Sequence, residues 1–255
     1  MQAPKNTVKA AILDGTPQMG IWLNTGSHVI AEIAGQAGFD WCLIDGEHGP
    51  NTVSEWLPQL QALTAAGTPA VIRIPNTDVW MVKQALDLGC QTIMVPMVDT
   101  PEDAREMAAA MRYPPLGKRG IGAAIARASH YGVRTDYLKN ANDEVCLIVQ
   151  AETQLALNNI EAIAAVDGID CIFIGPADLA ADMGYTGNPR HPDVVAAIED
   201  AFARITAAGK CAGFLIYDAG LIEHYTALGV TFLGIGSDVA VMGGALRNLA
   251  DTIPK

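Results

Sequence analysis

Two acidic residues lie at the C-terminal ends of apolar, strand-like runs, where they could take part in catalysis or bind a metal. Glu152 ends the apolar run VCLIVQAET (145–153), and Asp178 ends the run CIFIGPADL (171–179). In a parallel α/β fold the ends of neighbouring strands open into one crevice, so we expect the two acids to lie close together. Carboxylates at short range repel each other unless they share a proton or a cation lies between them. A divalent metal with oxygen ligands is therefore the first hypothesis.

Other polar side chains follow apolar runs in the same way. His48 lies in the turn DGEHGPN, which favours a general acid or base over a structural histidine. Arg73 lies in AVIRIPN, where burial without an anion would be costly, so it either pairs with an acid or stabilises an oxyanion. Further polar residues at predicted strand ends are Asp45, Glu47, Gln150 and Asp238. Their convergence from distant parts of the chain favours an enzyme over a binding scaffold.

The tetrapeptide Gly175-Pro176-Ala177-Asp178 can bind an anion through its backbone. Glycine permits close approach, and the amides of Ala177 and Asp178 can hold a substrate carboxylate, although many strand-to-helix turns have this composition. No lysine ends a predicted strand at this face, which disfavours Schiff-base chemistry unless Lys118 folds in. The sequence contains no GxGxxG, GxSxG or P-loop motif, which disfavours nucleotide binding and serine hydrolysis.

Apolar runs alternate with amphipathic segments along the chain. We expect strands at 19–24, 39–45, 69–74, 92–98, 145–152, 170–175, 211–217 and 231–236. Helical spacing of apolar residues recurs at 53–66, 78–88, 101–112, 155–165, 193–208 and 239–250. The alternation predicts a (β/α)8 TIM barrel in one domain, residues 1–255, with a doubly wound open sheet as the alternative.

One segment, residues 113–144, interrupts this alternation with two prolines, several glycines and much of the basic charge. It follows the fourth predicted strand, so we expect it to leave from the catalytic face, where long irregular insertions are often functional. Its residues Lys118, Arg119 and Arg127 either contact an anionic substrate or form salt bridges to acidic neighbours.

Composition narrows the range of partners and compartments. The chain has 255 residues, half of them hydrophobic, and a formal net charge of -12, which disfavours nucleic acid and anionic membranes as partners. The N-terminus lacks the apolar core of a signal peptide, and no stretch approaches the roughly 20 apolar residues of a membrane span. The five cysteines include no CxxC pair. We expect buried, reduced thiols in a cytoplasmic protein.

Six motifs taken together resemble a known family. DGEHGPN, the arginine after PAVI, TIMVPMV, RYPPLGKRGIG, VQAET and IGPADLAADMGYTGNP occur in the order seen in the HpcH/HpaI family of metal-dependent pyruvate aldolases. The resemblance covers nearly the whole chain. It implies cleavage of 4-hydroxy-2-oxo acids to pyruvate and an aldehyde, with 4-hydroxy-2-oxoheptanedioate, which yields succinic semialdehyde in aromatic catabolism, as the first substrate expected.

The resemblance also assigns residues. It implies a divalent metal, Mg²⁺, Mn²⁺ or Co²⁺, held by Glu152 and Asp178. It implies a catalytic arginine at Arg73 and a catalytic histidine at His48, which is oriented by an aspartate at Asp87. The substrate-binding residues that it implies are Arg73, Gln150, Gly175, Ala177, Asp178 and Leu215.

Asp87 bears on assembly. It lies near the end of the helix predicted at 78–88, at the end of a barrel opposite to His48. In the family this aspartate comes from a neighbouring subunit of a hexamer, a trimer of dimers, and the last helix is exchanged between protomers. We therefore expect an obligate homo-oligomer with shared sites. The alternative is a surface aspartate at a helix end.

Other reactions share a metal-enolate site. They are cleavage of 2-keto-3-deoxy-sugar acids, decarboxylation of oxaloacetate and acyl-CoA lysis, although no CoA-binding motif is recognisable. A non-catalytic oligomer that binds keto acids is a further alternative, disfavoured by the full set of polar residues at the strand ends. The sequence leaves the aldehyde, the metal and the role of Asp238 open.

Overall fold

Eight parallel strands close into a barrel in chain order. They appear in a computed structural model that describes residues 1–254. The strands are β1 Gln18–Leu23, β2 Trp41–Asp45, β3 Ala70–Arg73, β4 Thr92–Val95, β5 Cys146–Ala151, β6 Cys171–Ile174, β7 Cys211–Leu215 and β8 Val230–Ser237. Most strand residues are buried, as strands that pack inward on a barrel core and outward on helices must be. The predicted (β/α)8 barrel is confirmed.

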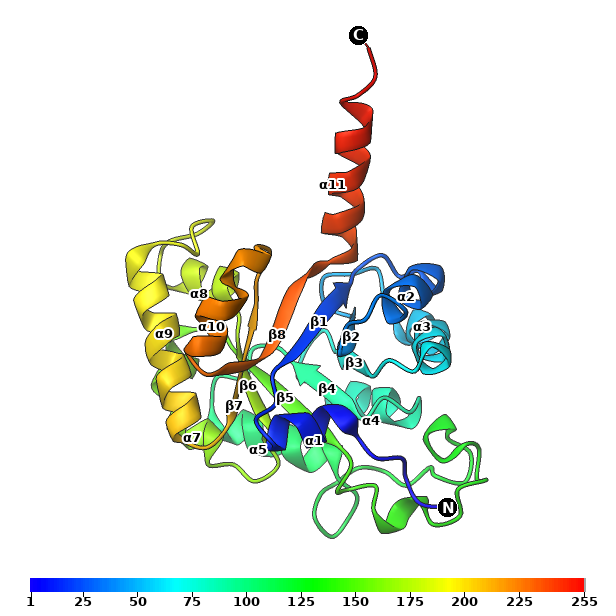
Figure 1. Cartoon of the computed structure of the whole chain (residues 1–255). Coiled ribbons are helices and arrows are strands. Elements are labelled where there is room, and N and C mark those ends of the chain that lie inside the picture. The colour runs from blue at the N-terminus through cyan, green and yellow to red at the C-terminus, as the bar shows by residue number, and fades with distance from the viewer. Residues whose placement is uncertain (255) are drawn as a thin grey trace.

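Helices lie around the barrel, except for the last one, which projects away from it (Figure 1). They are α1 Thr7–Leu13, α2 His28–Gly35, α3 Val53–Ala66, α4 Val79–Asp87, α5 Pro101–Met111, α6 Gln154–Asn158, α7 Ile160–Ala164, α8 Pro176–Asp182, α9 Pro192–Ala207, α10 Ile222–Ala227 and α11 Asp238–Ala250. Short 3₁₀ turns lie at η1 Arg127–Ser129, η2 Tyr137–Lys139 and η3 Ala219–Leu221. Helices α1, α2, α8 and α10 are additional to the segments with helical spacing given above. The helix predicted at 155–165 is interrupted at Asn159, whose side chain donates a hydrogen bond to the Asp99 carbonyl.

Aromatic residues fill the barrel. Trp41 stacks on Phe232 with ring centroids 4.1 Å apart, and Trp22 lies 5.6 Å from Phe173. These rings need glycine on the facing strands, because a Cβ at Gly20 would overlap Trp41. Val8 and Ile12 of α1 pack into the same cluster and close the N-terminal end of the barrel. The C-terminal ends of the strands are therefore the end at which a site is expected.

The irregular segment 113–144 lies at the opposite end from the one predicted. It connects the end of α5 to the start of β5, because α5 first carries the chain back from the C-terminal ends of the strands. The Arg127 guanidinium donates to the carbonyl of Leu88, just before β4, and Glu144 accepts from the backbone of Asn6, just before α1. The expectation that this segment leaves from the catalytic face is wrong, because the helix predicted at 101–112 lies between the fourth strand and the segment and returns the chain to the other end of the barrel.

The last helix, α11, extends away from the barrel, with the C-terminus beyond its far end (Figure 1). Its apolar side chains are exposed, including Val241, Leu246 and Leu249 at 60–67%. Asp238 is the one residue of α11 that is buried in residues 1–254. A helix with an uncovered apolar face gains little from its own barrel.

All five cysteines are free and buried, as the sequence predicts. Within residues 1–254, no helix combines the length and hydrophobicity that crossing a membrane would need.

Candidate active site

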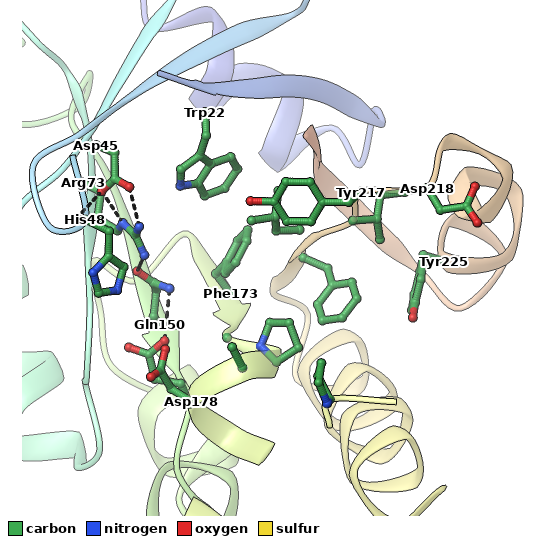
Figure 2. Close-up of a pocket in the computed structure, with 18 of the residues that line it drawn as sticks. Trp22, Asp45, His48, Arg73, Gln150, Phe173, Asp178, Tyr217, Asp218 and Tyr225 are labelled. Carbon is green, nitrogen blue, oxygen red and sulfur yellow. Dashed lines mark hydrogen bonds and ion pairs between the residues drawn. The ribbon is translucent and has the colours of Figure 1, made fainter. Parts of the chain in front are cut away.

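A cavity of about 530 Å³ opens at the C-terminal ends of the strands. Figure 2 shows Asp45, Arg73, His48, Gln150 and Asp178 gathered on one side of the view, with Tyr217, Asp218 and Tyr225 on the other. Trp22 and Phe173, both nearly fully buried, contribute the inner wall. The lining residues predicted from sequence are His48, Arg73, Gln150, Glu152, Gly175, Ala177, Asp178 and Leu215. Of the site residues that the resemblance implies, Asp87 alone does not line this cavity.

Arg73 ends β3 and is held by two acids. Its Nε and Nη2 donate to the two carboxylate oxygens of Asp45, at 2.9 and 2.7 Å. Its Nη1 lies 2.8 Å from Glu47 Oε2 and 3.4 Å from the Gln150 side-chain oxygen. Arg73 therefore pairs with acids in this chain, and this pairing leaves open whether it also stabilises an oxyanion. Because the guanidinium is planar, this fork fixes which edge faces the cavity.

Asp45 is the anchor of this cluster. It is fully buried at the end of β2, and it also accepts from the Asn24 side chain at 2.6 Å and from the backbone amides of Glu47 and His48. Burial alone would raise the pKa of Asp45, but hydrogen bonds from Arg73 and its positive charge outweigh this and hold the pKa below its usual value. Asp45 therefore stays ionised and fixes both Arg73 and the turn that carries His48.

Glu152 lies just beyond β5 and is 3% exposed. Its Oε1 accepts from the Met97 amide at 2.9 Å, and its Oε2 accepts from the Gln150 side-chain nitrogen at 3.2 Å. Met97 has a φ of 52°, an uncommon conformation for a residue with a side chain. Burial, with added repulsion from Glu47 and Asp178, raises the pKa of Glu152 to about 7. The site thus concentrates more negative charge than it can neutralise by itself.

Asp178 lies in the first turn of α8, beside Glu152 in the cavity wall. Gly175, just before this helix, permits the approach, because a Cβ there would overlap Glu152 Oε2. The Gly175 φ is -90°, so glycine is required here for space and not for backbone conformation. The sequence reasoning placed this glycine correctly but could not identify the Glu152 side chain as its reason.

His48 lies at the mouth of the cavity with its side chain 66% exposed. Its Nε2 is 3.9 Å from Glu47 Oε2, too far for a hydrogen bond. Within residues 1–254 the imidazole has no hydrogen-bond partner. The ring can reach a substrate, and a group outside this chain could still orient it.

Asp87 lies at the other end of the barrel, as the last residue of α4. Its carboxylate accepts from Arg119 Nη2 at 2.7 Å. The basic residues of segment 113–144 are likewise paired within the chain, since Lys118 lies 2.7 Å from Glu106 and Arg127 donates to Leu88. Of the two alternatives for these residues, the salt bridge to an acidic neighbour is present for Lys118 and Arg119, whereas Arg127 donates to a backbone carbonyl instead.

Several residues of the site were not singled out by sequence reasoning. Arg190 lines the cavity and has no ion-pair partner within 4.0 Å in the described part of the chain. Asn24 and Met97 act through hydrogen bonds that only the folded chain reveals. Asp238, whose role was open, accepts from the backbone amides of Asn24 and Thr25 and so fixes the loop after β1.

A barrel mouth with buried carboxylates, a clamped arginine and an exposed histidine defines an enzyme class that stabilises negative charge on oxygen and moves a proton nearby. The chain matches the model of the HpcH/HpaI aldolase/citrate lyase family over residues 18–244. It belongs to that family, and it is a carbon–carbon lyase, as the sequence predicts.

Relatives and solved structures agree with this assignment. A hydroxypyruvate/pyruvate aldolase of Deinococcus radiodurans is 55% identical over 245 residues, 96% of this chain and 88% of that protein. A 4-hydroxy-2-oxo-heptane-1,7-dioate aldolase of Shigella sonnei is 49% identical over 246 residues, 96% of this chain and 94% of that protein. The crystal structure of a family member from Burkholderia cenocepacia superimposes with a TM-score of 0.93 at 38% identity, covering 97% of this chain and 98% of that one.

Proposed function

We propose that this chain is a divalent-metal-dependent pyruvate aldolase that cleaves 4-hydroxy-2-oxo acids to pyruvate and an aldehyde, and that catalyses the reverse addition. The observation that carries the proposal is the pair Glu152 and Asp178 in a cavity that also contains Arg73 and His48. Two relatives that are 50 and 55% identical are named hydroxypyruvate/pyruvate aldolase. We therefore propose hydroxypyruvate, besides pyruvate, as a substrate that forms the enolate.

The donor groups fit a hard divalent cation. Glu152 and Asp178 offer carboxylate oxygens, and the raised pKa of Glu152 reflects burial and repulsion that a cation would relieve. Residues 1–254 contain no group of three or more His, Cys, Asp or Glu side chains arranged to hold a metal. Two carboxylates supplemented by water and substrate oxygens are a usual Mg²⁺ site, and Mn²⁺ and Co²⁺ accept the same donors. When bound, the metal would supply Lewis-acid polarisation of the 2-keto group.

Arg73 adds positive charge where the substrate ketone becomes an enolate oxygen. Because Asp45 fixes the guanidinium from behind, no reorganisation is needed as negative charge develops. The amides of Ala177 and Asp178 lie in the first turn of α8, where helical N–H groups lack intrahelical partners, and they would hold the substrate carboxylate. The Gln150 side chain accepts a hydrogen bond from Arg73 and donates one to Glu152, which fixes these two side chains relative to each other.

His48 is the proposed base. It accepts the proton of the 4-hydroxyl while the C3–C4 bond breaks; the electrons of that bond become the enolate, and C4 becomes the aldehyde carbonyl. Protonation of the enolate at C3 gives pyruvate. We propose that Asp87 of a neighbouring subunit orients the imidazole, since no group of the same chain does so in residues 1–254.

Arg190 supports an aldehyde with a distal carboxylate. It is the second arginine that lines the cavity and, unlike Arg73, has no acid within 4.0 Å in residues 1–254. Succinic semialdehyde, from 4-hydroxy-2-oxoheptanedioate, carries such a group. Leu215 and Tyr217 also line this cavity. No observation here favours the acyl-CoA or the non-catalytic alternative.

We further propose a homo-oligomer, a hexamer in which α11 is exchanged between protomers. The exposed apolar face of α11 and its projection from the barrel support this arrangement (Figure 1). Exchange of a terminal helix between identical chains is an established route to such assemblies.

The proposal is tested by exchange of pyruvate methyl protons in D₂O, followed by NMR with metal-stripped protein and with Mg²⁺, Mn²⁺ or Co²⁺ restored. We expect exchange only with metal, and its loss in His48→Ala. A panel of aldehydes with and without a distal carboxylate would then identify the acceptor. A wild-type protein that exchanges no protons with any of these metals contradicts the proposal.

A further inference from the structure

Asp87 has one carboxylate oxygen bound and the other free. Its side chain is 29% exposed, and Oδ1 accepts from Arg119 at 2.7 Å. Oδ2 has no hydrogen-bond partner in the described chain. Gly122 leaves it uncovered, because a Cβ there would lie 3.6 Å from Oδ2 in van der Waals contact. The second oxygen is therefore unpaired in residues 1–254, on a side chain that is partly exposed.

Arg119 is buried far more deeply than an ordinary surface partner. Its side chain is 0% exposed, and its guanidinium carbon lies 4.3 Å from the centre of the Tyr113 ring. Its Nε and Nη1 are buried without a hydrogen-bond partner in residues 1–254. Asp87 is the one carboxylate of that range within 4.0 Å. A buried guanidinium with a single anion holds that anion firmly, because separation would leave an unpaired buried charge.

The backbone that carries Arg119 is also fixed. The amide of Lys118 donates to the Ala109 carbonyl at 2.7 Å, and the amide of Arg119 donates to the Arg112 carbonyl at 2.9 Å. Gly117 is needed for this bend, because a Cβ there would overlap both carbonyl oxygens. Arg119 is thus attached to the end of α5, although it lies in an irregular segment.

We propose that Arg119 is a positioning residue, which holds Asp87 by one oxygen so that the other accepts the imidazole N–H of His48 in a neighbouring copy of this chain. The inference rests on the proposed function, in which His48 is the base and Asp87 comes from an adjacent subunit. Arg119 itself touches no substrate. The competing explanation is a structural ion pair that only anchors segment 113–144.

Two measurements separate these explanations. Exchange of pyruvate methyl protons needs the base, and so depends on the orientation of His48. Binding of oxalate with Mg²⁺, measured by calorimetry, reports the enolate-binding part of the site and needs no proton transfer. A positioning defect slows exchange and leaves oxalate affinity intact, whereas a damaged fold weakens both.

The principal variant is Arg119→Met, which keeps the length of the side chain without its charge. We expect exchange to slow by roughly 10–100-fold, with the oxalate Kd changed by less than about twofold. In an Asp87→Asn background the same substitution should slow exchange by less than about twofold further, because both changes remove one interaction. Lys118→Met, at an exposed neighbour with its own partner, should leave both measurements unchanged.

A conservative variant covers the case in which Arg119→Met does not assemble. Arg119→Lys keeps the charge but loses the planar fork, so it should fold and regain part of the exchange rate with normal oxalate affinity. Loss of oxalate affinity in parallel with exchange, or additive effects with Asp87→Asn, would overturn the inference. So would unimpaired exchange in Arg119→Met alongside impaired Asp87→Asn. Unimpaired Asp87→Asn, or wild type without exchange, would instead overturn the proposed function and this inference with it.

Discussion

At the scale of single residues, the site is defined by how its charges are shared. Asp45 is bound to Arg73 by two hydrogen bonds and keeps a lowered pKa, while Glu152 is further from the guanidinium and has its pKa raised to about 7. These two carboxylates of the cavity thus have different roles: Asp45 fixes an arginine, and Glu152 would be stabilised by a cation. Environments that push titratable groups apart in this way are typical of catalytic sites.

Arg73 has a catalytic role distinct from metal binding. Arg73→Ala should lower kcat by roughly 10²–10³-fold, because a fixed charge beside the enolate oxygen is lost. Metal affinity, measured by calorimetry, should fall less than in Glu152→Ala, which removes a donor atom. Both variants need circular dichroism as a control, since Arg73→Ala leaves Asp45 buried without its partner. Equal loss of metal in the two variants would contradict this assignment.

The raised pKa of Glu152 predicts how metal binding and stability depend on pH. Its ordinary value is 4.5, and in the fold it is about 7. The folded protein therefore holds an extra proton between these values, and the stability that this proton supplies is lost as the pH rises through about 7. Metal competes with the proton, so Mn²⁺ should raise the Tm more at about pH 8 than at about pH 6. Glu152→Gln should abolish most of that difference; a pH-independent increase in wild type would contradict the prediction.

At the scale of elements, the sequence predicts the barrel because strand-length apolar runs alternate with amphipathic helical segments. It misses α1, which has only Val8 and Ile12 to pack into the barrel. The sequence-based prediction places segment 113–144 at the wrong end of the barrel. The segment follows α5 and not β4 directly, and each helix of the barrel returns the chain to the N-terminal ends of the strands. The residues at strand ends are predictable since parallel strands open at one face. Their partners, such as Met97 for Glu152, depend on loop geometry that no periodicity encodes.

The turn from β6 to α8 gives a prediction at this scale. Gly175→Ala should weaken metal binding and activity by roughly 10–100-fold, because the new Cβ would displace the Glu152 carboxylate. The backbone tolerates alanine at this φ, so the fold should persist. Calorimetric titration with Mn²⁺ measures the effect. Ala181→Ser, at an exposed position on α8, is the matched control, and equal affinities in the two variants would show that the turn has room to relax.

At the scale of the whole molecule, the barrel cannot bring its own proposed dyad together. His48 follows β2 at the open end, whereas Asp87 ends α4 at the closed end, paired with Arg119. The apolar face of α11 is exposed as well. Both features are explained if neighbouring chains cover α11 and if Asp87 of one chain lies beside His48 of the next. Assembly would then be a condition of catalysis and not only of stability.

This arrangement predicts that two inactive chains restore each other. His48→Ala lacks the base, and Asp87→Asn lacks the orienting carboxylate, so each alone should show little pyruvate exchange. Co-expressed with different tags and purified through both, the mixed oligomer should recover activity at about a quarter of its sites, where random mixing joins an intact His48 to an intact Asp87. Co-expression of His48→Ala with a tagged His48→Ala is the control. If the mixed oligomer is no more active than its components, His48 and Asp87 do not act across a subunit boundary, and the orientation of the imidazole must come from the same chain.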